Sequence, residues 1–259
     1  MKIPYYHIDA FTSSSFAGNP AGVCPLETWL PDVTLQKIAA ENNLSETAFF
    51  VPAGDHFELR WFTPAIEVDL CGHATLASGY VLTRFLGYTG DVIRFESKSG
   101  ALLVERQGEI LTLDFPSRPG EKRAAPEALV KGLGIRPLEV FQARDYLAVF
   151  PSQADILAIQ PNQEQLALLD CLGIIVTAPG DGVDFVSRFF APRVGIPEDP
   201  VTGSSHCTLI PYWAKRLGKT KLTARQLSAR GGELFCSLVG ARVKIGGHAV
   251  TYLKGELEV

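Results

Sequence analysis

The sequence predicts an α+β protein with two pseudo-symmetric lobes, in each of which a curled, mostly antiparallel or mixed sheet surrounds a central helix. Three observations support this prediction: an internal repeat, strand-like segments on both sides of each predicted helix, and a first helix without a polar face. A repeat indicates that one structural unit occurs twice. A helix that is apolar or small on every side must be buried all round, and a sheet curled around it is the simplest way to bury it.

The repeat relates the two halves of the 259-residue chain at a nearly constant shift. Residues 57–64, FELRWFTP, align with residues 185–192, FVSRFFAP, at a shift of 128. Residues 72–87 and 203–218 each begin with glycine and end in Leu-Gly, at a shift of 131. The change in shift predicts an insertion of three residues in the second half, just before its helix.

Each half contains the same order of elements. Strand-like segments come first, among them residues 56–62 and 183–189. A helix then begins near His73 or Ser204, and the glycine that closes each aligned stretch serves as its C′ residue. Further strands follow, such as residues 102–105.

The sequence also predicts a further helix and an irregularity in the second central helix. An amphipathic helix is predicted over residues 31–41, with Asp32 as the candidate N-cap. Pro211 lies inside the second central helix, where a proline should kink the helix or cost a hydrogen bond.

A linker rich in proline and glycine, residues 116–122, divides the chain. It predicts a first lobe over residues 1–117 and a second lobe over residues 118–247. Residues 248–259 contain the strand-like run AVTYL and are expected to return to the first lobe.

Composition excludes several functional classes. A formal charge of −4 gives no reason to expect nucleic acid or an anionic membrane as partner. No run of eighteen apolar residues and no signal-like N-terminus is present, so the protein is expected in the cytoplasm. The five cysteines are scattered without metal-ligand spacing, which argues against a metal site or a disulfide framework.

The start of each central helix suits a bound carboxylate. Unpaired N–H groups and a partial positive charge lie at a helix N-terminus. Gly72 and Gly203 allow close backbone approach, and Thr202, Ser204 and Ser205 offer hydroxyl groups. Ordinary helix capping would explain the same residues, and the matching positions in both halves make a ligand in a cleft between the lobes an equal alternative.

The two halves differ in their acidic residues. At a shift of 128, Glu46 aligns with Ile174, so the second half lacks this acid. His73 opens the first helix and Asp199 precedes the second. A carboxylate beside an imidazole can act as a general acid or base, typically worth ~10²–10⁴ in rate. A solvated turn glutamate, a helix cap and a satisfied histidine are the structural alternatives.

These segments resemble those of the PhzF-like family, the phenazine-biosynthesis F-type isomerases, which are related in fold to diaminopimelate epimerase. The matching motifs are DAF at 9–11, FAGNP at 16–20, NLSET at 43–47, DLCGHAT at 69–75, EDPVTGS at 198–204 and SARGG at 228–232. The resemblance covers nearly the whole chain. It implies a two-lobed fold, an active site between the lobes and a homodimer.

The resemblance also implies roles for individual residues. The glutamate at the position of Glu46 acts as a general acid/base that moves a proton between carbons. The residues that match the assisting positions are His73, Asp199 and Ser204. The predicted substrate-binding residues are Gly18, Asn19, Gly72, Thr202, Gly203, Ser205 and Gly231.

We therefore expect a cofactor-independent, metal-free isomerase of biosynthesis that moves a proton on a small carboxylate-bearing metabolite. A non-catalytic protein that binds small carboxylates is one alternative. A second is an amino-acid epimerase that uses Cys71 with Glu46. Diaminopimelate epimerase places a cysteine at both helix starts, whereas Thr202 stands at the second position here, which argues against a two-thiol racemase. Cys71 can instead be a small buried residue.

Overall fold

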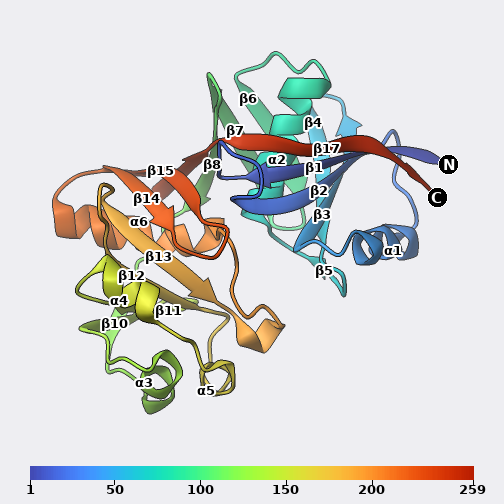
Figure 1. Ribbon diagram of the computed structural model, residues 1–259. Coiled ribbons are helices and arrows are strands. Elements are labelled where there is room, and N and C mark those ends of the chain that lie inside the picture. Colours follow the sequence, from blue (N-terminus) through green and yellow to red (C-terminus); the bar gives the residue numbers. More distant parts are fainter. The chain divides into compact units, whose positions relative to one another are not determined.

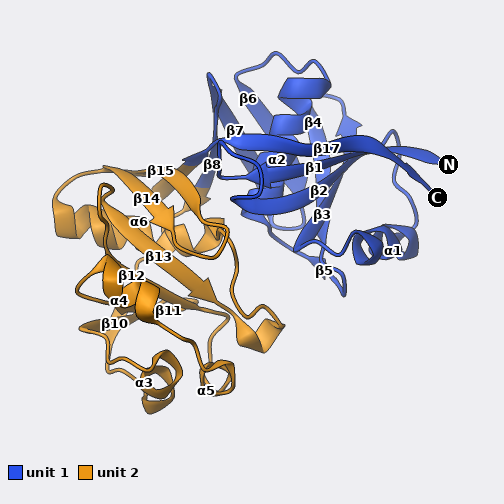
Figure 2. Cartoon of the chain, viewed as in Figure 1, with its two compact units in different colours: residues 1–114, 246–259 blue, residues 115–245 orange.

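The computed structural model describes all 259 residues of the chain (Figure 1). The chain divides into two compact units: unit 1 comprises Met1–Asp114 and Gly246–Val259, and unit 2 comprises Phe115–Ile245 (Figure 2). None of the helices is both long and apolar enough to span a membrane.

Unit 1 contains two helices, the strands that precede the linker and the last strand of the chain. Its elements are β1 (Lys2–Ala10), β2 (Asn19–Pro25), α1 (Asp32–Asn42), β3 (Glu46–Ala53), β4 (His56–Phe62), β5 (Glu67–Val68), α2 (Gly72–Phe85), β6 (Val92–Ser97), β7 (Gly100–Gln107), β8 (Ile110–Pro116) and β17 (Ala249–Glu258). The strands are neighbours in the order β17, β1, β2, β3, β4, β6, β7 and β8. Helix α2 is buried over most of its length and contacts β1, β2, β3, β7 and β17 (Figure 1). The predicted central helix within a curled sheet is therefore confirmed.

Unit 2 repeats this arrangement. Its elements are β9 (Glu121–Arg123), α3 (Glu127–Leu133), β10 (Glu139–Gln142), β11 (Tyr146–Val149), α4 (Gln153–Ala158), α5 (Gln163–Ala167), β12 (Ile174–Pro179), β13 (Phe185–Phe190), the 3₁₀ helix η1 (Pro192–Val194), α6 (Gly203–Leu217), β14 (Lys221–Gln226), β15 (Gly232–Val239) and β16 (Arg242–Gly247). Its strands are neighbours in the order β9, β10, β11, β12, β13, β14 and β15. The pairs β11–β12 and β13–β14 are parallel, and the other four pairs are antiparallel. The pairings from β17 to β7 in unit 1 follow the same series, so both sheets are mixed and mostly antiparallel.

An arginine–glutamate pair shows where the inserted residues lie. In unit 1, Arg60 donates two hydrogen bonds to Glu67, at 2.7 and 3.0 Å. In unit 2, Arg188 donates two to Glu198, at 2.8 and 2.9 Å. The arginines differ by a shift of 128 and the glutamates by 131. The three extra residues therefore fall between Arg188 and Glu198, in the segment that contains η1.

Two local expectations about the helices need revision. Helix α1 begins at Asp32 and its N-cap is Pro31, so Asp32 is not the N-cap. The Asp32 carboxylate instead accepts a hydrogen bond from Arg60 at 2.9 Å. Helix α6 continues through Pro211, which cannot donate to the carbonyl four residues before it, that of Cys207. The backbone N–H of Arg118 donates to this carbonyl at 2.8 Å, so the linker replaces the lost hydrogen bond.

Strand register corrects the alignment of Glu46 by one residue. In the β3–β4 pair, Phe49 lies opposite Arg60; in the β12–β13 pair, Val176 lies opposite the equivalent arginine. Glu46 lies three positions before Phe49, and Gly173 lies three positions before Val176. The counterpart of the glutamate is therefore a glycine, one residue before the isoleucine that the sequence shift indicates.

A side chain does not fit at Gly173. A Cβ atom built on this residue would lie 2.2 Å from the ring of Phe189. We predict that Gly173→Ala lowers the free energy of unfolding by roughly 1–3 kcal/mol, because the packed ring must move. Chemical denaturation measures this change.

Gly255→Ala is the matched control, since its added Cβ would find no atom closer than 3.7 Å. Equal stabilities for the two variants would contradict the close packing at Gly173.

Equivalent positions in α2 and α6 make the same backbone contact. The Thr75 hydroxyl donates to the Cys71 carbonyl at 2.5 Å, and His206 Nδ1 donates to the Thr202 carbonyl at 2.8 Å. His206 is fully buried. Burial lowers its pKa to about 4, against a smaller rise from the hydrogen bond to Thr202. The ring is therefore neutral at pH 7.

This burial predicts a pH-dependent stability. The unfolded state gains a proton on His206 near its ordinary pKa of about 6.5, whereas the folded state gains it only near 4. Stability is therefore lost as the pH falls from 6.5 towards 4. We expect His206→Thr, which introduces the residue of the other unit, to lose less stability over this range than the wild type. Urea denaturation at several pH values gives the slope of the free energy of unfolding against pH for the wild type and for His206→Thr. Equal slopes would contradict the prediction.

Candidate active site

The N-terminus of α2 has no side-chain cap. Cys71 is the N-cap residue, with φ −141° and ψ 114°, and its side chain makes no capping hydrogen bond. The first backbone N–H groups of a helix have no partner within the helix. Gly72 adds no side chain over them. Ordinary capping by these side chains therefore does not explain this helix start, which remains suited to an anion.

Glu46 and His73 are brought together at this helix start. Glu46 is the first residue of β3, and His73 lies in the first turn of α2. Glu46 Oε2 lies 3.3 Å from His73 Nε2, and the two side chains are 14% and 6% exposed. The predicted acid and its predicted imidazole neighbour thus form one pair, in which the ring is buried and the carboxylate is partly buried.

Burial determines the charge of His73. Removal from water lowers the pKa of the imidazole to about 3, while a hydrogen bond with the Pro20 backbone raises it by less. The ring is therefore neutral at pH 7. The ring donates its hydrogen to the Pro20 carbonyl, makes no hydrogen bond from Nε2 to Glu46 Oε2, and adds no positive charge beside Glu46.

Cys71 completes a cluster of three polar groups. Its sulfur lies 3.5 Å from His73 Nδ1, and ligand atoms of Glu46, Cys71 and His73 all lie within 4.8 Å of one another. Thiolate, imidazole and carboxylate are the donors that zinc binds. The thiol and the carboxylate, however, face opposite nitrogens of one ring, and only one of these nitrogens can bind a given ion. His73 Nε2 and Glu46 Oε2 are in contact without a hydrogen bond between them.

The turn before β2 borders the same cluster. Gly18 and Asn19 are buried and precede Pro20, whose backbone contacts the His73 ring. Gly18 has φ +67°, and a Cβ there would lie 2.2 Å from the Ala10 carbonyl oxygen. Close packing against β1 therefore requires this glycine. Contact of Gly18 or Asn19 with a substrate stays a prediction.

In unit 2, a fully buried glutamine organises the segment before α6. Gln226 accepts from the Thr202 N–H at 2.9 Å and donates to the Asp199 carbonyl at 2.7 Å. Its amide also donates to the Thr202 hydroxyl at 3.1 Å. That hydroxyl donates in turn to the Asp199 carboxylate at 2.5 Å instead of capping α6. Asp199 and Thr202 are thus held together.

The serines of α6 have different partners. Ser204, half-buried, accepts a hydrogen bond from Arg144 at 2.9 Å. Ser205 is buried and donates to the Thr202 carbonyl at 2.8 Å, so its hydroxyl serves the helix backbone. Gly203 lies at the helix start between Thr202 and these serines.

Gly231 is joined to the same region through Ser228. The Gly231 N–H donates to the Ser228 hydroxyl at 3.1 Å, and that hydroxyl donates to the Pro200 carbonyl at 2.8 Å. Unit 2 therefore gathers the predicted residues Asp199, Thr202, Gly203, Ser204, Ser205 and Gly231 around the start of α6. A ligand shared with the start of α2 stays a prediction.

Two residues of this site carry no recognisable signal in the sequence. Gln226 ends a strand, and Arg144 precedes β11. Gln226 makes three hydrogen bonds to Asp199 and Thr202, and Arg144 makes one to Ser204, and all of these partners are distant in sequence. Only packing shows that they belong to the site.

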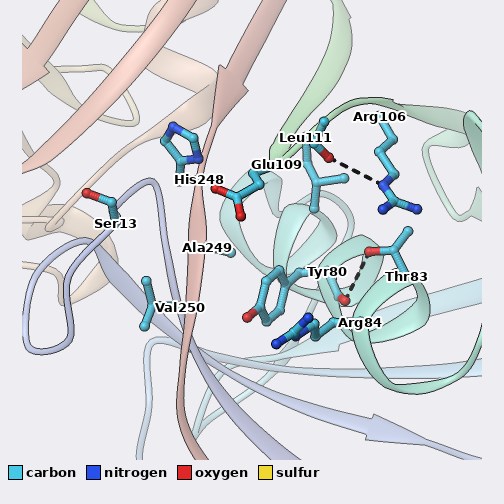
Figure 3. Close-up of a pocket in the computed structure, with 11 residues that line it drawn as sticks. Ser13, Tyr80, Thr83, Arg84, Arg106, Glu109, Leu111, His248, Ala249 and Val250 are labelled. Atoms are coloured by element: carbon cyan, nitrogen blue, oxygen red, sulfur yellow. Dashed lines mark hydrogen bonds between the residues drawn. The ribbon is translucent and has the colours of Figure 1, made fainter.

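A pocket of about 410 Å³ lies elsewhere in unit 1 (Figure 3). It is lined by Tyr80, Thr83 and Arg84 of α2, near the C-terminal end of that helix. Glu109 and His248 lie on other sides of it. None of the predicted site residues lines this pocket. This pocket is therefore separate from the Glu46–His73 pair.

Known proteins match the chain over its whole length. The family model described as "Phenazine biosynthesis-like protein" matches residues 8–255. An "uncharacterized isomerase" of Pseudomonas aeruginosa is 51% identical and aligns over 100% of both chains. A crystal structure of a PhzF-family phenazine biosynthesis protein from Enterococcus faecalis is 47% identical, with a TM-score of 0.99 and full coverage of both chains.

A more distant structure confirms the fold class. The crystal structure of a probable proline racemase from Agrobacterium radiobacter has a TM-score of 0.65 at 10% identity, over 99% of this chain and 93% of that one. The predicted diaminopimelate epimerase-like fold and the resemblance of the motifs are thus both confirmed. The chain is a member of the phenazine biosynthesis-like (PhzC-PhzF) family of isomerases.

Proposed function

We propose that this isomerase moves a proton on a small carboxylate-bearing metabolite without a cofactor, with Glu46 as the general acid/base. The observation that carries the proposal is the buried Glu46–His73 pair beside the uncapped start of α2. The Glu46 carboxylate can carry a proton, and the backbone N–H groups at the helix start can donate hydrogen bonds to an anion.

The reaction would consist of two balanced proton transfers. The ionised Glu46 carboxylate takes a proton from a carbon that is α or vinylogous to the substrate carboxylate, and the C–H electron pair delocalises towards that carboxylate. Glu46, now protonated, returns the proton to a different carbon. Backbone N–H groups would stabilise the negative charge that develops between the steps. No electrons leave the substrate, so no redox partner is required.

The remaining predicted residues would assist this transfer. Neutral His73 would hold Glu46 in position, because its Nε2 lies 3.3 Å from the carboxylate. Asp199 and Ser204 would contact the substrate from the segment that Gln226 and Arg144 hold in place. A homodimer and a cytoplasmic location remain predictions from the sequence.

The first test replaces the proposed proton carrier. Wild type is incubated in heavy water with a panel of small carboxylates, and mass spectrometry detects deuterium in each. We expect Glu46→Gln to abolish exchange of the reactive substrate, with a fall of at least ~10²-fold in rate. Substrate binding should persist, because the amide has nearly the same shape.

Glu109→Gln is the matched control. Glu109 lines the pocket of Figure 3 and lies outside the Glu46 cluster, so its replacement should leave exchange unchanged. Loss of exchange in Glu109→Gln with full activity in Glu46→Gln would move the reaction to that pocket.

The second test concerns the charge of His73. Because burial lowers its pKa to about 3, the ring should stay neutral throughout the physiological range. We predict that the NMR chemical shifts of its ring carbons stay constant from pH 8 to pH 5. A titration step near 6.5 would show instead that the ring is solvated or charged beside Glu46.

A non-catalytic carboxylate-binding protein is the second candidate, favoured by the uncapped starts of α2 and α6. Thermal stabilisation by a carboxylate without deuterium exchange of any panel member would support it. Turnover of one compound would exclude it.

A further inference from the structure

The Arg144 side chain is held on two sides at the start of α6. Its Nε and Nη2 groups donate to the Asp145 carboxylate at 3.4 and 3.0 Å, and Nη2 also donates to the Ser204 hydroxyl at 2.9 Å. The Asp145 side chain is only 2% exposed, so the ion pair is anchored in the interior of unit 2. The guanidinium is therefore fixed beside a predicted site residue.

One edge of this guanidinium is not used by the fold. A guanidinium has five N–H groups. The contacts with Asp145 and Ser204 use Nε and Nη2, so neither N–H group of Nη1 makes a hydrogen bond within the chain. The Arg144 side chain is 34% exposed, so part of it is open to a dissolved ligand.

Strand register aligns the turn before β11 with the turn before β2. In the β2–β3 pair, Gly22 lies opposite Thr47; in the β11–β12 pair, Tyr146 lies opposite Ile174. Thr47 and Ile174 are counterparts, because each follows by one residue the equivalent positions established above for β3 and β12. Gly22 and Tyr146 are therefore counterparts too, and so are the residues two positions before them.

Those two residues are Pro20 and Arg144. The Pro20 backbone contacts His73, the second residue of α2, and the Arg144 side chain contacts Ser204, the second residue of α6. Both turns thus border the start of a central helix at the same position. In unit 1 the border is a neutral backbone group, whereas in unit 2 it is a cation.

We infer that Arg144 binds a carboxylate of the substrate through its Nη1 edge, beside the start of α6. This inference rests on the proposed function, in which the substrate bears a carboxylate. Hydrogen bonds between a guanidinium and a carboxylate are charge-assisted and strong. The Ser204 oxygen accepts from Arg144, so its own hydroxyl hydrogen is left to donate to the same ligand. Helix α6 has no side-chain cap, and the partial positive charge of its N-terminus favours an anion there as well.

The competing role is purely structural: Arg144 would only hold Ser204 in place. Loss of that support would weaken every ligand of the site alike, charged or neutral. Loss of a carboxylate-binding cation would weaken the carboxylate but not its primary amide, which has nearly the same shape and no charge. Comparison of an acid with its amide therefore separates the two roles.

The main variant removes the whole ion pair. Arg144→Gln alone would leave the buried Asp145 carboxylate without its partner, which destabilises a fold. Arg144→Gln is therefore combined with Asp145→Asn. Arg144→Lys is a second variant, because an ammonium keeps a charge beside Asp145 but lacks the separate Nη1 edge.

The experiment measures binding without turnover. Thermal shifts select the carboxylate of the panel that stabilises the wild type most, and calorimetry gives the Kd of this acid and of its primary amide. We expect the double variant to raise the Kd of the acid roughly 10–100-fold, as for the loss of a hydrogen bond to a charged group, with little change for the amide. Arg144→Lys should weaken the acid in the same direction.

Arg216→Gln is the matched control. Arg216 lies in the last turn of α6 and donates to Glu139 at 3.1 Å, so its replacement removes an arginine–carboxylate pair from the opposite end of the same helix. Both Kd values should stay at the wild-type level in this variant.

Three results would overturn the inference. They are an unchanged Kd of the acid in the double variant, equal weakening of acid and amide, and a wild type that binds no carboxylate of the panel. Failure of the proposed function gives a different result: full deuterium exchange by Glu46→Gln would refute the proton transfer, while the binding comparison at Arg144 would still stand.

Discussion

The burial of α2 on nearly all sides is the constraint on which the site depends. A helix with no polar face stays in the centre of its sheet, and its N-terminus is then fixed against the strands that enclose it. His73, in the first turn, is buried as a consequence, and burial makes the ring neutral. The same packing presents the ring to Glu46 at the start of β3. The chemistry of the pair is therefore a product of core packing more than of the two residue types.

Unit 2 has the same arrangement of strands around a central helix, but different side chains lie near the start of that helix. Its sheet has the same series of pairings, and the Arg188–Glu198 pair repeats the one in unit 1. At Gly173, the counterpart of Glu46, an added side chain would meet the ring of Phe189. Gln226 fixes the segment before α6. The repeats thus differ in that only unit 1 carries a glutamate at this position.

Three polar side chains, Glu46, Cys71 and His73, gather at the start of α2. Here the sulfur faces an imidazole that already faces a carboxylate. The Pro20 carbonyl accepts the hydrogen bond of this ring. A neutral ring has only one N–H group, whereas a charged imidazole would donate from both nitrogens.

Local periodicity and motifs of neighbouring residues were enough to predict the repeat, both central helices, the family, and the presence of the acid in one half only. Tertiary structure alone decided the contact of Glu46 with His73, the neutral charge of that ring and the roles of Gln226 and Arg144. It also corrected the counterpart of Glu46 and the N-cap of α1, and it showed that the Arg118 N–H compensates for Pro211. The physical reason is that hydrogen bonds and desolvation join segments far apart in the chain, and no local pattern records which segments pack together.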